Sequence, residues 1–459
     1  MRRFSLVGRL GPDDMTSVKP VQTDSAVYEI NFLDSDRRMG FGIRHALDQV
    51  ASLGLRSSER AIDLVVLAAL VTAGDTRVSR RINAQDGWTR EVDLYVPVSA
   101  PKVWNDARQS IEALLRFLTG DRWRVFFHAR SDRTMALAMQ PRRVAIDDFT
   151  EVSLLSGGLD SLIGAINLLA KGRHPLFVSH YWDAETAKAQ TCVLRALEKH
   201  FRGDEIKSVR VRLGFDRHHL ETREKEATQR GRSFLFYALA ALAASAFDRP
   251  MAVDIPENGL IALNVPLDPL RLGALSTRTA HPHVIAGMRR LVDAVGLSVS
   301  FSNPYRHMTK GEMVSGCADG AFLRKIIGDS MSCSSPAKAR YRKLSPRHCG
   351  YCVPCLIRRA SLKAGLGVKD PTLYTVEKLR AKTLATDGAE GEHVRSFQLM
   401  VKRIKAAPGL AKILVHKPGP LVEAPDEIPA YADVFRRGVL EVGGLLHGVK
   451  ARPGGGVRS

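Results

Sequence analysis

The segment between residues 151 and 170 constrains the fold of this chain more than any other. It runs from a short apolar stretch, 152–155, through a glycine turn into a second apolar stretch with helical spacing, 162–170. A strand that passes through such a turn into a helix leaves backbone N–H groups free at the helix start, where the helix dipole favours an anion. We therefore predict a phosphate-binding loop. Its residues are Ser156, Gly157, Gly158, Leu159, Asp160 and Ser161.

The residue types of this loop suit a phosphate chain. Gly157 and Gly158 let the backbone approach an anion closely and permit positive φ, and the two serines add hydroxyl donors. Asp160 would repel a phosphate unless it holds a Mg²⁺ ion or binds the backbone N–H groups of the loop, and both roles stay open. The sequence does not match the Walker A loop or the Gly-x-Gly-x-x-Gly turn of dinucleotide folds.

Strand and helix patterns alternate after this loop. The spacing of apolar residues predicts helices over 184–200 and 232–247. Three further short apolar runs read as strands, at 176–179, 206–213 and 251–255. Strands that alternate with helices of this length imply right-handed crossovers and a parallel sheet covered on both faces, which is an α/β fold.

The region before the loop is predicted to be a separate α+β domain. Apolar and polar residues alternate over 91–98, as in a strand with one buried face, and Pro97 favours an edge position. A helix is expected over 59–73, capped by Ser57 or Ser58 and ended by Gly74, and another over 104–118, ended by Gly120.

Chain length and hydropathy bound the class of protein. A chain of 459 residues is longer than one hydrophobic core usually organises. We predict domains at 1–148, 149–375 and 376–459, the last of them helical with a mobile tail from Ala451. No apolar run approaches the roughly 20 residues that span a bilayer, and the N-terminus lacks the apolar stretch of a secretory signal. We expect a cytoplasmic protein that does not bind membranes.

The net charge of +20 suits a polyanionic partner. Nucleic acid is possible but not required, because arginines spread along the chain also arise from coding bias. Trp88, Trp104 and Trp123 could form a base-stacking platform, but their neighbours place them on core faces, and we predict that they pack inside.

Four of the six cysteines fall within 23 residues and end in Cys-x2-Cys-x2-Cys. Four thiolates satisfy tetrahedral Zn²⁺ with no open position, so a structural zinc site is predicted, with an iron–sulfur cluster as the alternative. Cys192 and Cys317 are expected to be buried or incidental, and His348 is expected to lie just behind the metal ligands or at the surface. The predicted ligands are Cys333, Cys349, Cys352 and Cys355.

Together these motifs resemble a known family. Ser-Gly-Gly-Leu-Asp-Ser after Val-Ser-Leu-Leu is similar to the PP-loop signature of the N-type ATP pyrophosphatases, and with the cysteines it resembles the QueC family, the 7-cyano-7-deazaguanine synthases. The stretch Arg230 to Phe236 resembles the family's arginine-bearing helix start, and Thr309 to Met313 its Thr-Lys step. The resemblance covers roughly residues 150–370.

The resemblance implies a fold of the PP-loop type, similar to the adenine nucleotide alpha hydrolases, and an ATP-dependent ligase. Such an enzyme adenylates 7-carboxy-7-deazaguanine, releases pyrophosphate and passes the acyl group to an amine, with ATP, Mg²⁺ and Zn²⁺ as cofactors. Asp160 would hold Mg²⁺, while Arg232 and Lys310 would neutralise the α-phosphate or form ion pairs. Arg278 and His281 could meet the substrate carboxylate.

Several features depart from an ordinary QueC enzyme. The extensions before and after the motifs, the fifteen-residue first cysteine gap, and the segments 257–264 and 276–282 all differ. They resemble the QueC-like proteins of bacterial anti-phage operons, the QatC group, which implies protein partners from a defence operon and an amine on such a partner. A housekeeping synthase, a PP-loop tRNA-modifying enzyme and a non-catalytic nucleotide-binding subunit remain alternatives.

Overall fold

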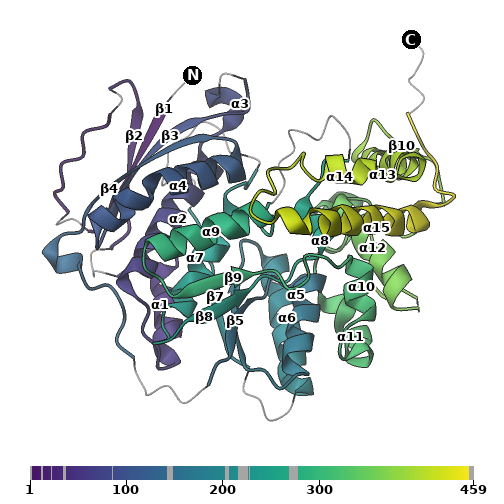
Figure 1. Cartoon of the computed structure of the whole chain (residues 1–459), viewed down its shortest axis with the longest axis horizontal. Coiled ribbons are helices and arrows are strands. Elements are labelled where there is room, and N and C mark those ends of the chain that lie inside the picture. The colour runs from purple at the N-terminus through teal and green to yellow at the C-terminus, as the bar shows by residue number, and fades with distance from the viewer. Residues whose placement is uncertain are drawn as a thin grey trace.

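The protein is a mixed α/β structure with two large parallel sheets and a small two-stranded one among the described residues, seen in a computed structural model (Figure 1). The model describes residues 3–11, 14–21, 23–34, 38–84, 86–141, 148–201, 206–215, 226, 228–267, 278–367 and 369–453.

The N-terminal sheet contains four parallel strands in the order β2-β1-β3-β4. The strands are β1 (Arg3–Arg9), β2 (Ala26–Asn31), β3 (Glu91–Val98) and β4 (Arg122–Ala129). The helices between them are α1 (Ile43–Ser52), α2 (Glu59–Arg77), α3 (Arg80–Asn83) and α4 (Pro101–Thr119). The predicted α+β class was therefore wrong here, because all four strands run in one direction, with helices in the connections after β2 and after β3.

The expectation for β3 was also wrong. β3 pairs with β1 on one side and β4 on the other, so it is internal, and residues 92–98 are all buried. Pro97 has no N–H to donate. It is tolerated because the pairing of β3 with β1 ends at Tyr95, so no residue of β1 needs a hydrogen bond from position 97. The alternation misled because Asp93 and Tyr95 are buried by side chains of the neighbouring strand: Arg124 donates to Asp93, and the Tyr95 ring stacks on Phe126.

The two helices expected in this unit are present. Ser58 caps α2 by accepting a hydrogen bond from the Ala61 N–H at 3.2 Å, but the helix continues through Gly74 to Arg77. α4 ends at Gly120, whose positive φ of 78° supplies the expected left-handed cap. Trp104 and Trp123 are buried as predicted, and the guanidinium of Arg230 lies 3.7 Å above the Trp88 ring.

The second sheet has five parallel strands in the order β7-β6-β5-β8-β9, which confirms the predicted parallel α/β pattern. Its strands are β5 (Glu151–Leu154), β6 (Pro175–His180), β7 (Ser208–Val211), β8 (Met251–Asp254) and β9 (Val299–Ser302). The helices beside it are α5 (Leu159–Leu169), α6 (Ala184–His200), α7 (Arg232–Ala244), α8 (Gly259–Leu263) and α9 (Pro282–Ala294).

The order of these strands fixes where a ligand can bind. β5 is central, the chain adds β6 and β7 on one side, and it then returns to place β8 and β9 on the other. The connections after β5 and β8 therefore leave in opposite directions, and sheets of this kind bind ligands in a crevice outside the carboxyl ends of the strands at such a point. The predicted phosphate loop directly follows β5.

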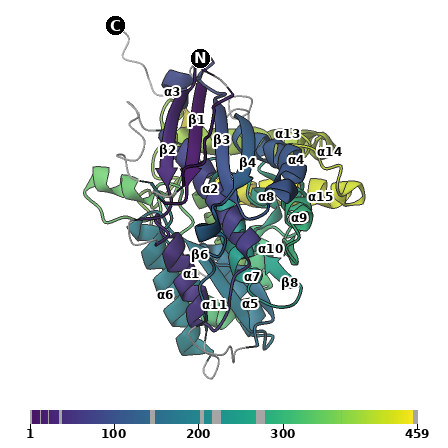
Figure 2. The same cartoon turned by 90° about the vertical axis from the view of Figure 1, so that its left-hand side faces the viewer.

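The two sheets share one hydrophobic core. α2 of the N-terminal unit packs against α7 of the second sheet, and a continuous apolar cluster extends from Phe4 to Phe301. A second cluster covers the opposite face of the second sheet under α5 and α6. The boundary expected at residue 148 falls between the sheets, yet the facing helices are packed together (Figure 2).

The C-terminal region is helical, as expected, and has its own apolar cluster with α8 and α12. The remaining helices are α10 (Lys310–Ser315), α11 (Gly320–Ile326), α12 (Val353–Gly365), α13 (Ala389–Ala406), α14 (Leu410–Leu414) and α15 (Ile428–Leu446). Residues Ala451–Arg452 form β11, which pairs with β10 (Leu384–Ala385), so the predicted mobile tail begins too early. Residues 454–459 of that tail lie outside the described residues. No described helix combines the length and apolar character needed to cross a membrane.

A buried ion network joins the N-terminal unit to the start of α7. Arg80 and Arg90 both donate to Asp121 at 2.6 Å, and all three side chains are at most 4% exposed. Asp75 accepts from both arginines and, through its second oxygen, from the Gly231 N–H at 2.7 Å. Because Gly231 immediately precedes α7, the network fixes where that helix begins.

We predict that Asp121→Ala lowers the free energy of unfolding by about 3–5 kcal/mol, because it leaves two buried guanidinium groups with Asp75 and with Glu226, which lies 3.4 Å from Arg80. Urea denaturation followed by circular dichroism measures the change. Asp106→Ala, which removes an exposed partner of Lys102, is the control and should cost under about 1 kcal/mol. Equal effects of the two variants would show that the buried network does not stabilise the fold.

Candidate active site

The predicted phosphate loop has the expected backbone geometry. Gly157 adopts a φ of 82°, and a Cβ there would lie 3.1 Å from the backbone and side chain of Gln190, so only glycine fits. Gly158 has an ordinary φ of −83° and caps α5 without a side-chain bond. The N–H groups at the start of α5, which have no partner within the helix, therefore face a turn with no bulky side chain.

The two serine hydroxyls of the loop bond to the loop itself. Ser156 Oγ accepts from the Gly158 N–H at 3.2 Å and lies 3.1 Å from Ser161 Oγ. Ser161 Oγ also donates to the Gly158 carbonyl at 3.1 Å. These contacts hold the turn in shape, and an arriving phosphate would exchange with them.

A second segment, Ser330 to Cys333, lies against the loop from far along the chain. The Met331 N–H donates to the Gly157 carbonyl at 2.8 Å, and the Leu159 N–H donates to Ser332 Oγ at 3.4 Å. One N–H at the start of α5 is therefore satisfied by a hydroxyl that a ligand could replace. The geometry of the loop depends on where this segment is held.

Asp160 lies at the junction of three elements. Its Oδ2 accepts from the backbone and side-chain amides of Asn258, at 3.2 and 2.7 Å, and its Oδ1 lies 3.1 Å from Lys310 Nζ. The side chains of Asp160 and Lys310 are each 6% exposed. The ends of β5 and β8 and the start of α10 are thus joined at one buried carboxylate.

Lys310 occupies an unusual position for a cation. It is the first residue of α10, where the helix dipole disfavours positive charge. Thr309 and Glu312 complete a capping box that fixes this helix start, and Thr309 also donates to Glu441. The ammonium group is stabilised by Asp160, so the two predicted site residues are brought together.

Glu257 was missed as a candidate site residue. Burial and the adjacent Asp160 carboxylate raise the pKa of Glu257 well above its usual range, and Lys310 opposes that shift. Asn303, just after β9, holds the Glu257 backbone by donating to its carbonyl at 2.8 Å. The only signal in the sequence is that Glu257 follows a short apolar strand, as the phosphate loop does. Two carboxylates therefore meet one lysine in the crevice.

Arg232 lies at the start of α7, on the β6 side of the sheet. Burial lowers the pKa of Arg232, with Asp183 opposing the shift, and its Nε has no hydrogen-bond partner. His180, at the end of β6, is 1% exposed; burial lowers its pKa to about 4, and its Nδ1 is also without a partner. Gln190 Nε2 donates to the carbonyls of Ser156 and His180, which joins this group to the phosphate loop.

The structure places Arg278 and His281 in a different environment from the one predicted. Arg278 donates to the Phe117 carbonyl at 2.6 Å and lies 4.4 Å above the ring of that residue. His281 caps α9 by accepting from the His283 N–H, and burial lowers its pKa to about 3. Both residues pack against α4 of the N-terminal unit, so their described contacts connect helices.

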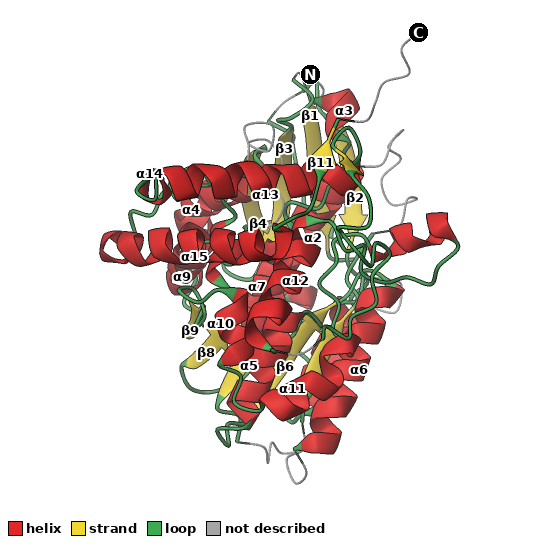
Figure 3. Ribbon diagram, turned by 90° about the vertical axis from the view of Figure 1, so that its right-hand side faces the viewer, coloured by secondary structure: helices red, strands yellow, loops and turns green. Residues whose placement is uncertain are grey.

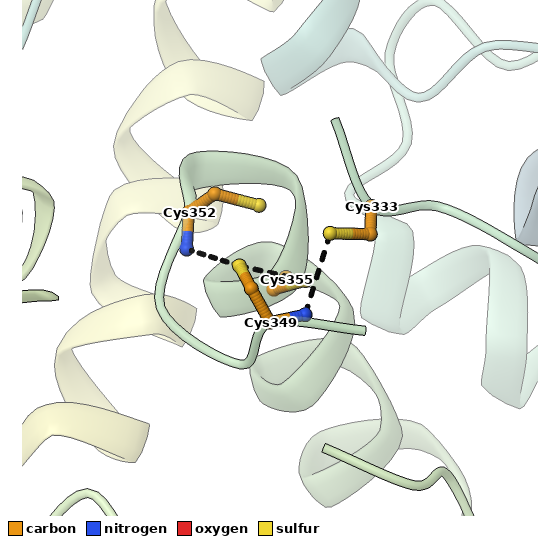
Figure 4. A group of neighbouring side chains, drawn as sticks. All are labelled: Cys333, Cys349, Cys352 and Cys355. Carbon is orange, nitrogen blue, oxygen red and sulfur yellow. Dashed lines mark hydrogen bonds between the residues drawn. The ribbon is translucent and has the colours of Figure 1, made fainter. Parts of the chain in front are cut away.

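The four predicted cysteines converge on one point (Figure 4). Their sulfur atoms all lie within 4.8 Å of one another, and Cys349 Sγ is 3.8 Å from Cys355 Sγ. Zn–S bonds of about 2.3 Å in a tetrahedron place sulfurs about 3.8 Å apart, so the group can hold one metal ion such as zinc. An iron–sulfur cluster needs more room between its thiolates, which favours a single ion.

Backbone amides support this group of sulfurs. The Cys349 N–H donates to Cys333 Sγ and the Cys352 N–H to Cys349 Sγ, both at 3.3 Å. Such donors stabilise thiolate charge. Cys192 and Cys317 are half-buried and lie outside the group, as expected.

Arg358 connects the cysteine group to the phosphate loop. It is fully buried on α12 and donates to Ser330 Oγ at 2.9 Å and Ser332 Oγ at 3.3 Å. His348 is 3% exposed and accepts from the Ser332 N–H at 3.1 Å, which places it beside the ligands as predicted. The segment that covers the loop is therefore held by residues next to the cysteines on both sides.

No protein-family model, curated protein or solved structure matches this chain. What the site can do therefore follows from its own residues.

We predict that Lys310→Met lowers the free energy of unfolding by about 3–5 kcal/mol, because two buried carboxylates lose their cation. The added change Asp160→Asn should restore part of that loss, since it removes one of the charges. A double-mutant cycle in urea measures the coupling. Additive effects of the two changes would contradict the ion pair seen here.

We predict one zinc ion per chain by elemental analysis, and less than half of that in Cys355→Ser. Removing the metal with a chelator should speed hydrogen exchange in segments 330–333 and 156–161, because the cysteine group holds one segment against the other. Cys317→Ser is the matched control and should retain the ion. Unchanged hydrogen exchange in the metal-free protein would show that the cysteine group does not hold the phosphate loop in place.

Proposed function

We propose that this chain is an ATP-dependent adenylating ligase. The observation that carries the proposal is the junction of the Ser-Gly-Gly-Leu-Asp-Ser loop, Asn258 and Lys310 at the crevice of a parallel sheet. A free helix N-terminus with a glycine turn suits a phosphate chain, and a lysine at its side suits the charge of phosphoryl transfer. The resemblance of the motifs to the QueC family agrees with this assignment.

The reaction we propose begins with a carboxylate oxygen of the acid. That oxygen attacks the α-phosphorus of ATP, the bond to the bridging oxygen of the β-phosphate breaks, and pyrophosphate leaves. N–H groups of Gly158 and Leu159 would stabilise the departing pyrophosphate once it displaces Ser156 and Ser332. An amine nitrogen then attacks the acyl carbon, AMP leaves and one proton is released.

Two cationic side chains lie near the phosphate loop, one on each side of it. Lys310 lies on the β8 side beside Asp160, and Arg232 lies on the β6 side beside His180. The Nε of Arg232 is buried and has no hydrogen-bond partner, which suits an anion that arrives with the nucleotide. We therefore assign the two residues to opposite sides of the triphosphate.

The carboxylates of Asp160 and Glu257 fit a Mg²⁺ ion. They are adjacent, the Asp160 side chain is buried and Glu257 is partly buried, and the single charge of Lys310 cannot balance both carboxylates. Hard oxygen ligands of this kind are those that Mg²⁺ prefers, and the ion would neutralise phosphate charge when bound.

We propose 7-carboxy-7-deazaguanine as the acid and an amine on a partner protein as the acceptor, within an anti-phage defence system and in the cytoplasm. The support is the QueC-like motif set together with the N-terminal unit, which a small-molecule ligase would not require. That unit contributes no described residue to the phosphate loop, but it fixes the start of α7 and hence Arg232.

The test is pyrophosphate release by the purified chain with Mg-ATP and 7-carboxy-7-deazaguanine, with hydroxylamine present to trap the acyl adenylate as a hydroxamate. We expect AMP, pyrophosphate and hydroxamate in equal amounts. Asp160→Asn should lower the rate on the order of 100-fold, since it alters the charge around the transferring phosphoryl group. Lys405→Met, on the exposed face of α13, should not change it.

Two results would contradict parts of the proposal. No pyrophosphate release with this acid, with or without partner proteins, would exclude adenylation of it. Release that yields only free nitrile from ammonia, with no acyl group on any partner by mass spectrometry, would leave the adenylation intact and exclude the protein acceptor. Stimulation by tRNA alone would favour an RNA-modifying enzyme.

A further inference from the structure

The segment between the first and second cysteines carries a concentrated positive charge. Residues 334–347, called the basic segment here, contain five lysines or arginines and no acidic residue. Their middle forms a short helix, η5 (Pro336–Arg342). Figure 2 shows this helix, in light green, extending from the body of the protein. Neither the phosphate loop nor the cysteine group uses these charges.

Two arginines attach the basic segment to the fold. Arg340 pairs with Glu185 of α6 at 2.7 Å, and Arg342 pairs with Glu390 of α13. Both arginine side chains remain about half exposed or more, at 66% and 45%. The segment is therefore held in place at two points along its length.

The other three cations have no acidic partner. Within the described part of the chain, no carboxylate pairs with Lys338, Lys343 or Arg347, and the guanidinium of Arg347 bonds only to Ser345. Tyr341 lies between the paired arginines with its side chain 89% exposed. An exposed aromatic ring among unpaired cations offers stacking and phosphate contacts together.

The positive charge continues beyond this segment into a groove. Glu390, which pairs with Arg342, also pairs with Lys382 at 3.2 Å. Just before Lys382 lies a cavity of about 1310 Å³, whose cationic lining residues include Lys369, Lys378 and Arg380. Two carboxylates also line this cavity, and one of them, that of Asp370, accepts hydrogen bonds from the Thr372 N–H and the Tyr374 hydroxyl. A strand of several phosphates could follow this path.

We infer that the basic segment and this groove bind single-stranded nucleic acid beside the nucleotide site. Bases stack on exposed aromatic rings regardless of sequence, and lysine and arginine side chains follow the backbone phosphates. An acidic protein would satisfy the charges as well, but protein partners anchor on apolar side chains, and in the basic segment Ala339 is buried and only Tyr341 is a large exposed side chain with apolar surface. The inference does not depend on the adenylation proposed above.

The test is fluorescence anisotropy of labelled 12-nucleotide DNA and RNA strands, with a 12-residue polyglutamate peptide as the comparison. We expect the strands to bind and the affinity to fall with salt. The triple variant Lys338→Glu, Lys343→Glu and Arg347→Glu should bind at least about tenfold more weakly, with a salt slope smaller by about 2, as expected for three lost phosphate contacts.

Two further variants separate stacking from general charge. Tyr341→Ala keeps every charge and should weaken binding about tenfold with an unchanged salt slope. The triple variant Lys402→Glu, Lys405→Glu and Lys412→Glu makes the same charge change on α13 and α14, at exposed residues, and should bind at least threefold more tightly than the first triple variant. Thermal unfolding verifies that every variant is folded.

Three results would overturn the inference. The first is equal binding of polyglutamate and nucleic acid, which would indicate an acidic protein partner. The second is equal loss in the two triple variants, which would indicate net charge alone. The third is no salt-dependent binding by the wild type.

Discussion

Asp160 is a buried carboxylate, and the surrounding structure depends on how its charge is satisfied. Lys310 supplies the opposite charge and Asn258 supplies two hydrogen bonds, so the ends of β5 and β8 and the start of α10 must meet. An isolated charge at this depth would cost several kcal/mol. The pair therefore positions the phosphate loop, the segment after β8 and the Thr-Lys helix start relative to one another.

The cysteine group extends this arrangement from the other side of the loop. Residues next to the cysteines, Arg358 and His348, hold Ser330 and Ser332 in place, and Met331 bonds to Gly157. Figure 3 shows α12, which carries the last cysteine, beside α10 and α15. A metal ion that ties the four sulfurs together would make this path more rigid, because the buried side chains of Arg358 and His348, which hold the segment, lie next to the cysteines in the chain.

Four of the five strands of the second sheet could be predicted from the sequence, because they contain short apolar runs. β5 and β6 are buried along their whole length, and the cysteine spacing identified four side chains that converge. β9 was not predicted, because in its four residues buried positions alternate with exposed or partly exposed ones. The N-terminal strand β3 was misread because its polar residues are satisfied by tertiary partners, such as Arg124 beside Asp93. Glu257 was missed for a related reason: its environment is made by Asp160, almost one hundred residues earlier in the chain. The assignment of Asp160, Arg232 and Lys310 to ATP stays a prediction.

The N-terminal unit has a physical role that its sequence does not reveal. Asp75 belongs to that unit and accepts a hydrogen bond from Gly231, while Arg230 stacks on Trp88. Both contacts hold the residues that immediately precede Arg232, whose buried Nε has no hydrogen-bond partner. Because Arg232 is the first residue of α7, and the network around Asp75 and Asp121 fixes where α7 begins, a partner that binds the N-terminal unit could shift Arg232 through this network. The buried arginines are therefore one route by which the two sheets can influence each other, beside the packing of α2 against α7 and of α4 against α9.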